Sequence, residues 1–158
     1  MLRHGLYRIH QFDKVEQVII CANDEQESIK FHDEILANSE AVMQAIELPY
    51  RVVNVCTGDL GRGQVKKFDI ETWMPSRKGY GETMSNSIMG DFQTRRLKIK
   101  YRNKNGETAY CYSFNNTAIA SPRILIALLE NYQQADGSIV IPDVLRPWMG
   151  GIDVIQRA

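Results

Sequence analysis

Short segments rich in β-branched and aromatic residues, joined by turns, constrain the fold of this chain more than any other feature. Extended structure is predicted for residues 6–21, for YRVVNVC, for KKFDIETW and near Glu82–Ser85. The clearest hairpin joins RLKIKYR to ETAYCYSF through NKNG, in which Asn105-Gly106 supplies a turn that tolerates positive φ. In its first strand Leu97, Ile99 and Tyr101 alternate with Lys98, Lys100 and Arg102. Such a pattern is typical of a sheet built largely from antiparallel strands.

Only two helices are predicted beside these strands. The first is capped by Asn23 or Asp24 and stops at Leu48-Pro49, because proline disfavours a helical residue before it. The second runs roughly from Pro122 to Gln134 and is apolar enough to lie against the sheet. Strand–helix alternation is absent, and neither GxGxxG nor GxxxxGK[ST] occurs, which disfavours a Rossmann or P-loop fold. We therefore expect an α+β fold, an antiparallel sheet flanked by helices, in a single domain.

Composition excludes several classes of protein. Lys plus Arg equals Asp plus Glu at 19 each, so the whole chain offers no basic field for nucleic acid. The three cysteines are scattered and predict reduced thiols in the cytoplasm, with neither disulfides nor a zinc site, and the three histidines form no ligand cluster. No apolar run is long enough to span a membrane, and the first residues lack the apolar stretch of a signal peptide.

A candidate ligand-binding row lies near the beginning of the chain. If residues 6–16 form one strand, its alternating geometry places Arg8, His10, Phe12 and Glu16 on one face. Arginine can pair with phosphate oxygens, phenylalanine can stack on a base, and glutamate can accept from an ammonium or hydroxyl. The pattern alone favours the alternative, which is a solvated strand face.

Further candidates come from carboxylates, an arginine and two loops. Asp69 and Glu71 share a strand face, and with Glu82 and Ser85 they could hold Mg²⁺ against a polyphosphate, although surface carboxylates are the simpler interpretation. Arg123 stands among apolar helix residues and needs an anion, either a bound phosphate or a strand carboxylate. The TGDLGRG loop and the basic face of Lys98, Lys100 and Arg102 are interpreted as surface features rather than as phosphate or RNA sites.

Six segments together resemble the successive landmarks of seryl-tRNA synthetases. They cover nearly the whole chain, in family order and with family-like spacing: GLYRIHQFDKVE, ELPYRVVNVCTGDLG, DIETWMP, GETMSNSIMGDFQTRR, FNNTAIASPRILIALLENYQQADG and IPDVLRPWMGG. The resemblance implies the class II synthetase catalytic fold. It further implies that serine and ATP form seryl-adenylate, with Mg²⁺ organising the ATP, and that the seryl group then passes to serine tRNA.

The resemblance also implies roles for individual residues. Arg8 matches an arginine on the ATP phosphates, Phe12 the ring under adenine, and Arg123 the arginine on the γ-phosphate. Glu16, Asn115 and Thr117 match positions of the serine pocket. The stretch Glu82-Thr83-Met84-Ser85 matches the ATP- and metal-binding segment, in which Glu82 and Ser85 face the metal. Arg8, Glu82 and Arg123 are accordingly the expected catalytic residues.

Set against the resemblance, residues 1–158 are expected to be a partial catalytic domain that begins within the second class motif. The family's amino-terminal tRNA-binding arm, its first class motif, which builds the homodimer interface, and part of the serine pocket have no counterpart here. Little ligase activity is expected from these residues alone. Two alternatives stay open: a synthetase-like ligase that charges a carrier protein, and a non-catalytic remnant of an ATP pocket.

Overall fold

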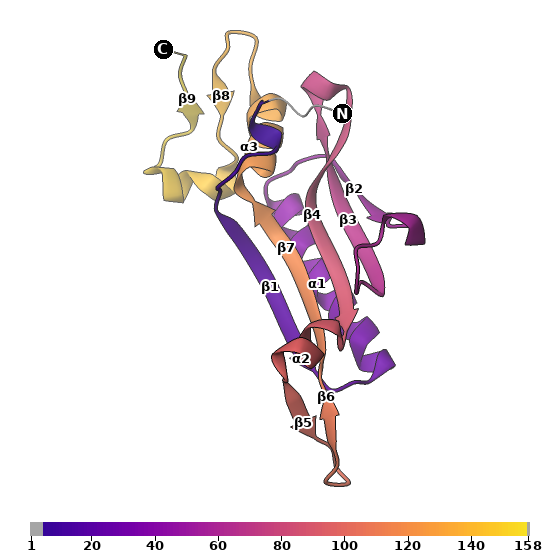
Figure 1. Ribbon diagram of the computed structural model, residues 1–158. Helices are drawn as coiled ribbons and strands as arrows, with labels where there is room; N and C mark the ends of the chain where they lie inside the picture. The colour runs from indigo at the N-terminus through magenta and orange to yellow at the C-terminus, as the bar shows by residue number, and fades with distance from the viewer. Residues whose placement is uncertain (1–4, 158) are drawn as a thin grey trace.

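The computed structural model describes residues 5–157, which are organised around one five-stranded sheet. The strand order is β1 (Lys14–Cys21), β7 (Tyr112–Ala120), β4 (Gly79–Gly90), β3 (Lys66–Met74) and β2 (Tyr50–Asn54) (Figure 1). Every neighbouring pair is antiparallel. This arrangement confirms the α+β fold with an antiparallel sheet.

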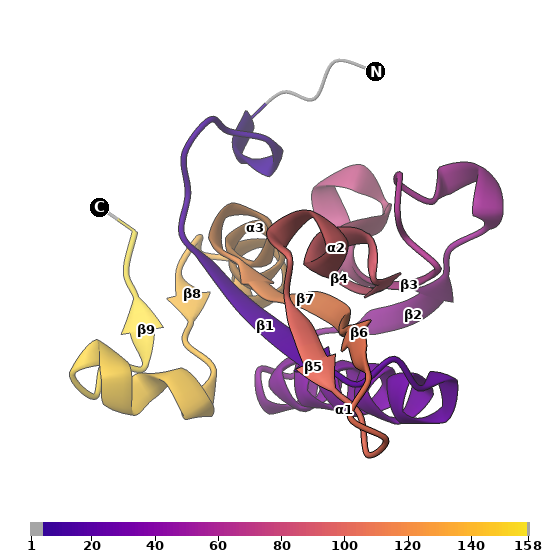
Figure 2. The same ribbon diagram turned by 60° about the horizontal axis from the view of Figure 1, so that its bottom comes forward.

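Two long helices, α1 (Glu25–Ala45) and α3 (Ser121–Tyr132), pack on the same face of the sheet. Figure 2 shows α1 running beneath the strands. One buried cluster joins the end of α1 to α3 and to the central strands, and its members are Met43, Ile46, Leu48, Ile70, Met84, Ile124 and Ala127. A second cluster joins Ile35 of α1 to Ile88 and Phe114 of the sheet. Among residues 5–157 the opposite face, called the open face below, carries neither long helix. Only the short helix α2 (Phe92–Leu97) covers one end of it, where it shares a hollow with Glu16 and Asn115.

The boundaries of both helices agree with the sequence. Asp24 is the N-cap of α1, and its carboxylate accepts a hydrogen bond from the Glu27 amide at 2.9 Å. The helix ends at Ala45, shortly before Leu48-Pro49. In α3, Pro122 occupies the first turn, where its missing amide has no helical partner to lose.

The extended structure predicted for residues 6–21 is a strand only from Lys14 to Cys21, so the condition that residues 6–16 form one strand is not met. Residues Gly5–Tyr7 form a 3-10 turn, η1, and β1 begins only at Lys14. The reason lies in the partner strand: Lys14 pairs with Ala120, the last residue of β7, and α3 begins at Ser121. Without a strand beside them, residues 8–13 have no ladder to join, so they run irregularly over the end of the sheet (Figure 1).

The predicted hairpin exists but is shorter than expected. Leu97 is the last residue of a short helix, α2 (Phe92–Leu97), which ends because Lys98 is left-handed with φ 57°. The hairpin consists of β5 (Lys100–Arg102) and β6 (Thr108–Tyr110), and Gly106 provides the positive φ of the turn. It projects from one end of the sheet, as both views show (Figures 1 and 2).

Smaller elements complete the structure. Two 3-10 turns, η2 (Thr57–Asp59) and η3 (Pro75–Arg77), lie in the connections that follow β2 and β3. The end of the chain forms β8 (Ile139–Val140), η4 (Asp143–Met149) and β9 (Val154–Ile155). Among residues 5–157, no helix is both long and apolar enough to cross a membrane.

Candidate active site

A cleft of about 220 Å³ lies where the open face of the sheet meets the segment before β1 and the start of α3. All of the residues expected to bind ATP line it. Its lining consists of Tyr7, Arg8, Ile9, Phe12, Lys14, Glu82, Thr83, Met84, Ser85, Thr117, Ala120, Pro122 and Arg123. Residues from three separate stretches of the sequence, 7–14, 82–85 and 117–123, thus meet in a single cleft.

A β-bulge in β4 places Glu82 and Ser85 on the same face. Side chains three apart on a regular strand point to opposite faces. Here Met84 pairs with Ile70 while Glu82 pairs with Glu71, so Thr83 is an extra residue in β4. Glu82 therefore shares the open face with Ser85, as the metal-binding role implied by the resemblance requires.

Hydrogen bonds of Thr83 hold this bulge on the buried side. Its hydroxyl lies 2.6 Å from the Thr72 hydroxyl and donates to the Ile70 carbonyl at 3.2 Å. Thr83 and Met84 border the cleft, but their residues are each only 1% exposed. Their side chains serve the core, so a bound nucleotide would meet them through the backbone.

A row of polar side chains crosses the open face beside the cleft. Glu16 of β1 pairs in register with Thr117 of β7, which pairs with Ser85 of β4, which in turn pairs with Asp69 of β3. The Thr117 hydroxyl donates to Glu16 Oε2 at 2.8 Å, and Lys14 Nζ approaches the same oxygen at 2.8 Å. Among the described residues both partners use Oε2, so Oε1 of Glu16 remains for a ligand.

Arg123 reaches the cleft from the first turn of α3. Its Nη1 lies 3.2 Å from Glu82 Oε2 and donates to the Glu82 backbone carbonyl, also at 3.2 Å. The carboxylate partner considered for this arginine is thus present. The side chain of Glu82 is 35% exposed, so it can also face a ligand in the cleft.

Negative charge gathers on the β3–β4 side of this face. Burial raises the pKa of Asp69 above its ordinary value, and the charge of Glu82 adds to the rise while Lys67 opposes it. A cation close to Glu82 and Ser85 would therefore be favoured. Within residues 5–157 there is no cluster of three or more metal-ligating side chains. The donors fit Mg²⁺, which takes one or two carboxylates and completes its shell with phosphate oxygens and water.

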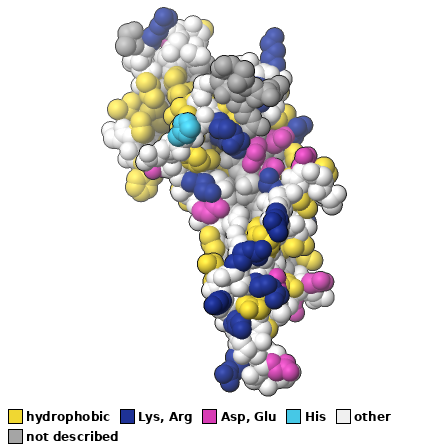
Figure 3. Space-filling view, viewed as in Figure 1, with side chains coloured by type: hydrophobic (Ala, Val, Ile, Leu, Met, Phe, Trp, Pro, Cys, Tyr) yellow, Lys and Arg dark blue, Asp and Glu magenta, His cyan; other side chains and the backbone are white. Residues whose placement is uncertain are grey.

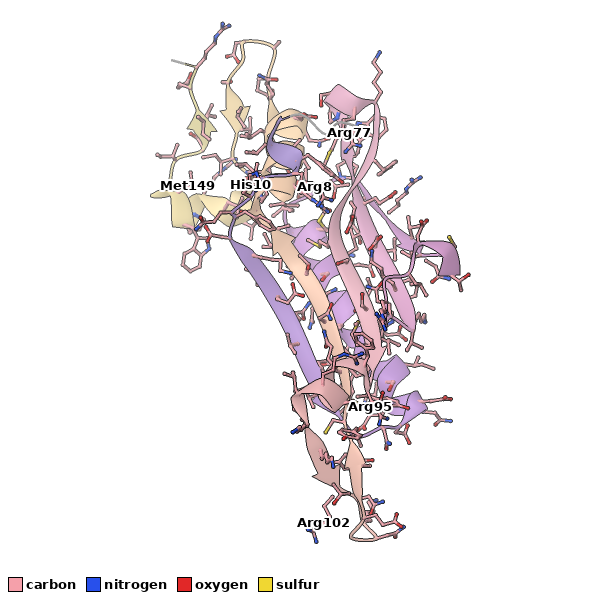
Figure 4. The ribbon with its side chains drawn as sticks, in the orientation of Figure 1. Arg8, His10, Arg77, Arg95, Arg102 and Met149 are labelled. Atoms are coloured by element: carbon pink, nitrogen blue, oxygen red, sulfur yellow. The ribbon has the colours of Figure 1, made fainter. Side chains whose placement is uncertain are left out.

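Two residues of the predicted site, Glu16 and Asn115, lie outside the cleft lining. His10 is exposed and does not line the cleft, because the strand that would have aligned it with Arg8 and Phe12 does not form (Figure 4). Asn115 lies outside the cleft and shares an adjacent hollow with Glu16. The TGDLGRG loop contributes nothing to the cleft lining.

Sequence reasoning missed two polar residues of the cleft, Tyr7 and Lys14. Lys14 could have been found, since it stands two residues before Glu16 and therefore on the same strand face. No sequence signal indicated Tyr7, which was assigned to a strand. His4 lies outside the described residues.

The basic hairpin is a separate surface. Figure 3 shows Lys and Arg side chains along the end of the molecule that carries α2, β5 and β6. Lys100 and Arg102 are exposed there, and Lys100 Nζ lies 4.8 Å from the centroid of the Tyr110 ring. These charges do not reach the cleft.

The fold and the cleft together define a class of protein. Residues 2–132 match the tRNA synthetase class II core domain family (G, H, P, S and T), and the chain belongs to this family. Its relatives include the serine–tRNA ligase of Deinococcus radiodurans, 52% identical over 153 residues that cover 97% of this chain and 36% of that protein. That of Dictyoglomus thermophilum is 53% identical over 146 residues, or 92% of this chain and 34% of that protein. The chain thus spans about a third of the length of these relatives.

Solved structures give the same result. Seryl-tRNA synthetase from Pyrococcus horikoshii, complexed with ATP, superposes with a TM-score of 0.93 at 43% identity, over 100% of this chain and 35% of that one. Prolyl-tRNA synthetase from Giardia lamblia has a TM-score of 0.80 over 91% of this chain and 28% of that one, at only 16% identity, and shows the shared fold alone.

Proposed function

We propose that these residues form the ATP- and serine-binding part of a serine–tRNA ligase. The observation that carries the proposal is that Arg8, Phe12, Glu82, Ser85, Thr117 and Arg123 line one cleft, with Glu16 bonded to Thr117 beside it. In the first step a carboxylate oxygen of serine attacks the α-phosphorus of ATP, and pyrophosphate leaves. In the second step a hydroxyl of the tRNA's terminal adenosine attacks the seryl carbonyl, and AMP leaves.

Catalysis in this proposal is mainly positioning and electrostatic stabilisation. Arg8 and Arg123 bind phosphate oxygens, and the ring of Phe12, which is 45% exposed beside the cleft, stacks on adenine. Glu16, with Oε2 held by Thr117 and Lys14, presents Oε1 to the ammonium or hydroxyl of serine. A pocket that bonds the serine hydroxyl rejects alanine, since its polar groups would otherwise remain unpaired.

Glu82 and Ser85 are the residues that would hold Mg²⁺. The ion would offset the charge of the triphosphate when it binds. These two side chains are available because the bulge at Thr83 turns both to the cleft. Glu82 also keeps Arg123 close through the 3.2 Å ion pair, so a cation and a carboxylate lie ready for opposite charges of the same ligand.

The same proposal extends to partners and compartment. By family resemblance the acceptor is serine tRNA and the working protein is a homodimer. Cys21, Cys56 and Cys111 are all free thiols, which supports a reducing compartment and hence the cytoplasm.

Binding measurements test this function. Titration calorimetry would measure the affinity for ATP with Mg²⁺ and for a stable sulfamoyl analogue of seryl-adenylate, next to its alanyl counterpart. We expect the seryl analogue to bind more tightly. Glu16→Gln should reduce that preference and leave ATP affinity close to the original value.

Arg123→Ala should weaken ATP binding with little effect on AMP binding. The matched variant Arg102→Ala, on the distant hairpin, should change neither affinity. If ATP does not bind, or if the seryl and alanyl analogues bind equally, the proposed function is wrong.

A further inference from the structure

Tyr7 connects three elements of the cleft. Its hydroxyl donates to the Glu82 backbone carbonyl of β4 at 3.0 Å. Arg123 of α3 donates to the same carbonyl, and its Cζ lies 4.7 Å from the centroid of the Tyr7 ring. Tyr7 of the η1 turn is therefore in contact with the backbone of Glu82 and with the side chain of Arg123, which are two of the expected catalytic residues.

A second guanidinium approaches the same ring from the β3–β4 turn. The Cζ of Arg77 lies 4.7 Å from the Tyr7 centroid, and Figure 4 shows Arg77 at the same end of the sheet as Arg8. A guanidinium beside an aromatic face is attracted by the ring quadrupole. In the described part of the chain no carboxylate lies within ion-pair distance of Arg77, so this ring is its principal charge-related contact.

Gly81, next to Glu82 in β4, provides the space that Arg77 occupies. A Cβ atom at Gly81 would lie 3.0 Å from Arg77 Nη1 and 3.0 Å from Met74 Sδ. A side chain at position 81 would therefore require the Arg77 guanidinium or the Met74 thioether to shift by a few tenths of an ångström. The bare backbone at Gly81 lets both groups lie where they do.

We propose, on the basis of the function proposed above, that Tyr7 is a positioning residue for Arg123, and that Arg77 fixes the Tyr7 ring. The ring limits where the Arg123 guanidinium can lie, and the hydroxyl ties the loop to the strand that bears Glu82. Arg123 is then already oriented toward the terminal phosphates before ATP arrives, so less side-chain freedom is lost on binding. Tyr7 acts through Arg123 and not on the base, so its effect belongs to the phosphate end of the nucleotide.

The test compares ATP with AMP in a double-mutant cycle on the full 158-residue chain. Tyr7→Leu should weaken ATP binding by about 3- to 30-fold, the range expected for a cation–π contact, and leave AMP binding nearly unchanged. In the Arg123→Ala background the same substitution should have little further effect on ATP. Tyr7→Phe keeps the ring and should retain most of the affinity.

A second variant perturbs the arrangement without altering Tyr7 or Arg123. Gly81→Ala should displace Arg77 and reduce ATP affinity in the same direction. Gly79→Ala is its matched control in the same strand, because a Cβ there meets only the Arg77 carbonyl oxygen, at an ordinary 3.7 Å.

The outcomes separate the two proposals. If the wild-type chain does not bind ATP, the proposed function fails and this inference fails with it. If ATP binds but Tyr7→Leu and Arg123→Ala act additively, or if Tyr7→Leu weakens AMP as much as ATP, Tyr7 serves only the local structure and this inference alone is overturned.

Discussion

Thr83 in the β4 bulge and Thr72 of β3 form a buried pair of hydroxyls, and we expect the two to contribute unequally to stability. Thr72 and Thr83 are 0% and 1% exposed, and their hydroxyls lie 2.6 Å apart. The Thr83 hydroxyl also donates to the Ile70 carbonyl, so the two residues do not contribute equally. Valine matches the shape of threonine, so neither substitution leaves a cavity, and the change in unfolding free energy reports the hydrogen bonds.

The expected magnitudes follow from which groups lose a partner. Thr83→Val leaves the buried Thr72 hydroxyl without a partner and takes a donor from the Ile70 carbonyl, so it should cost about 1–3 kcal/mol. Thr72→Val should cost about 1 kcal/mol or less, because the Thr83 hydroxyl keeps the carbonyl as acceptor. The double variant has no unpaired hydroxyl and should cost no more than Thr83→Val alone.

Urea denaturation, followed by far-ultraviolet circular dichroism and by tryptophan fluorescence, measures all three free energies. The two signals should give the same midpoint if unfolding has two states. If the double variant loses the full sum of the two single losses, the hydroxyls are not coupled, and the account of what holds the bulge is wrong.

Three further predictions concern the adenine-binding ring, the buried histidine of α1 and the N-cap of α1. Phe12→Ala should weaken ATP about 5- to 150-fold in calorimetry, as expected for loss of one base–aromatic stack, and an unchanged affinity would remove Phe12 from the adenine site. Burial lowers the pKa of His32 below its ordinary 6.5, so the unfolded chain binds more protons in acid and stability should fall as the pH drops through that value. His32→Gln should reduce the change in unfolding free energy between about pH 7.5 and about pH 5.5. An unchanged slope of free energy against pH would exclude His32 as the cause of the fall. Asp24→Ala should cost about 1 kcal/mol in thermal or urea unfolding while Asp24→Asn costs much less, and equal losses would mean that the bond to the Glu27 amide is not what caps α1.

Much of the fold could be predicted because local signals and tertiary packing agree. The cap at Asp24, the stop before Pro49 and the alternating strands all reflect short-range chemistry that the sequence displays directly. The extended structure predicted for residues 6–21 is absent over residues 8–13 for the opposite reason. Its residues have strand propensity, but a strand also needs a neighbour, and β7 turns into α3 opposite Lys14. No local pattern reveals where a partner ends.

The candidate site likewise has parts that the sequence could predict and parts that it could not. Family resemblance implied that Phe12, Glu16, Glu82 and Arg123 act together. All but Glu16 line one cleft, and Glu16 lies beside it. Periodicity alone would have separated Glu82 from Ser85. The bulge that unites them depends on the pairing with β3, which is a property of two strands and not of one. The contacts of Tyr7 with Arg77 and Arg123 join residues more than forty positions apart in sequence and leave no periodic trace.

Because both long helices cover one side of the sheet, that side forms the hydrophobic core and the other side is available to bind ligands. Side chains such as Met84 and Phe114 on the covered side form the buried core, while the next residues of the same strands, Ser85 and Asn115, lie on the opposite side. A change of substrate then requires only substitutions that leave the packing of the hydrophobic core unchanged. The same backbone can therefore support sites for different amino acid substrates.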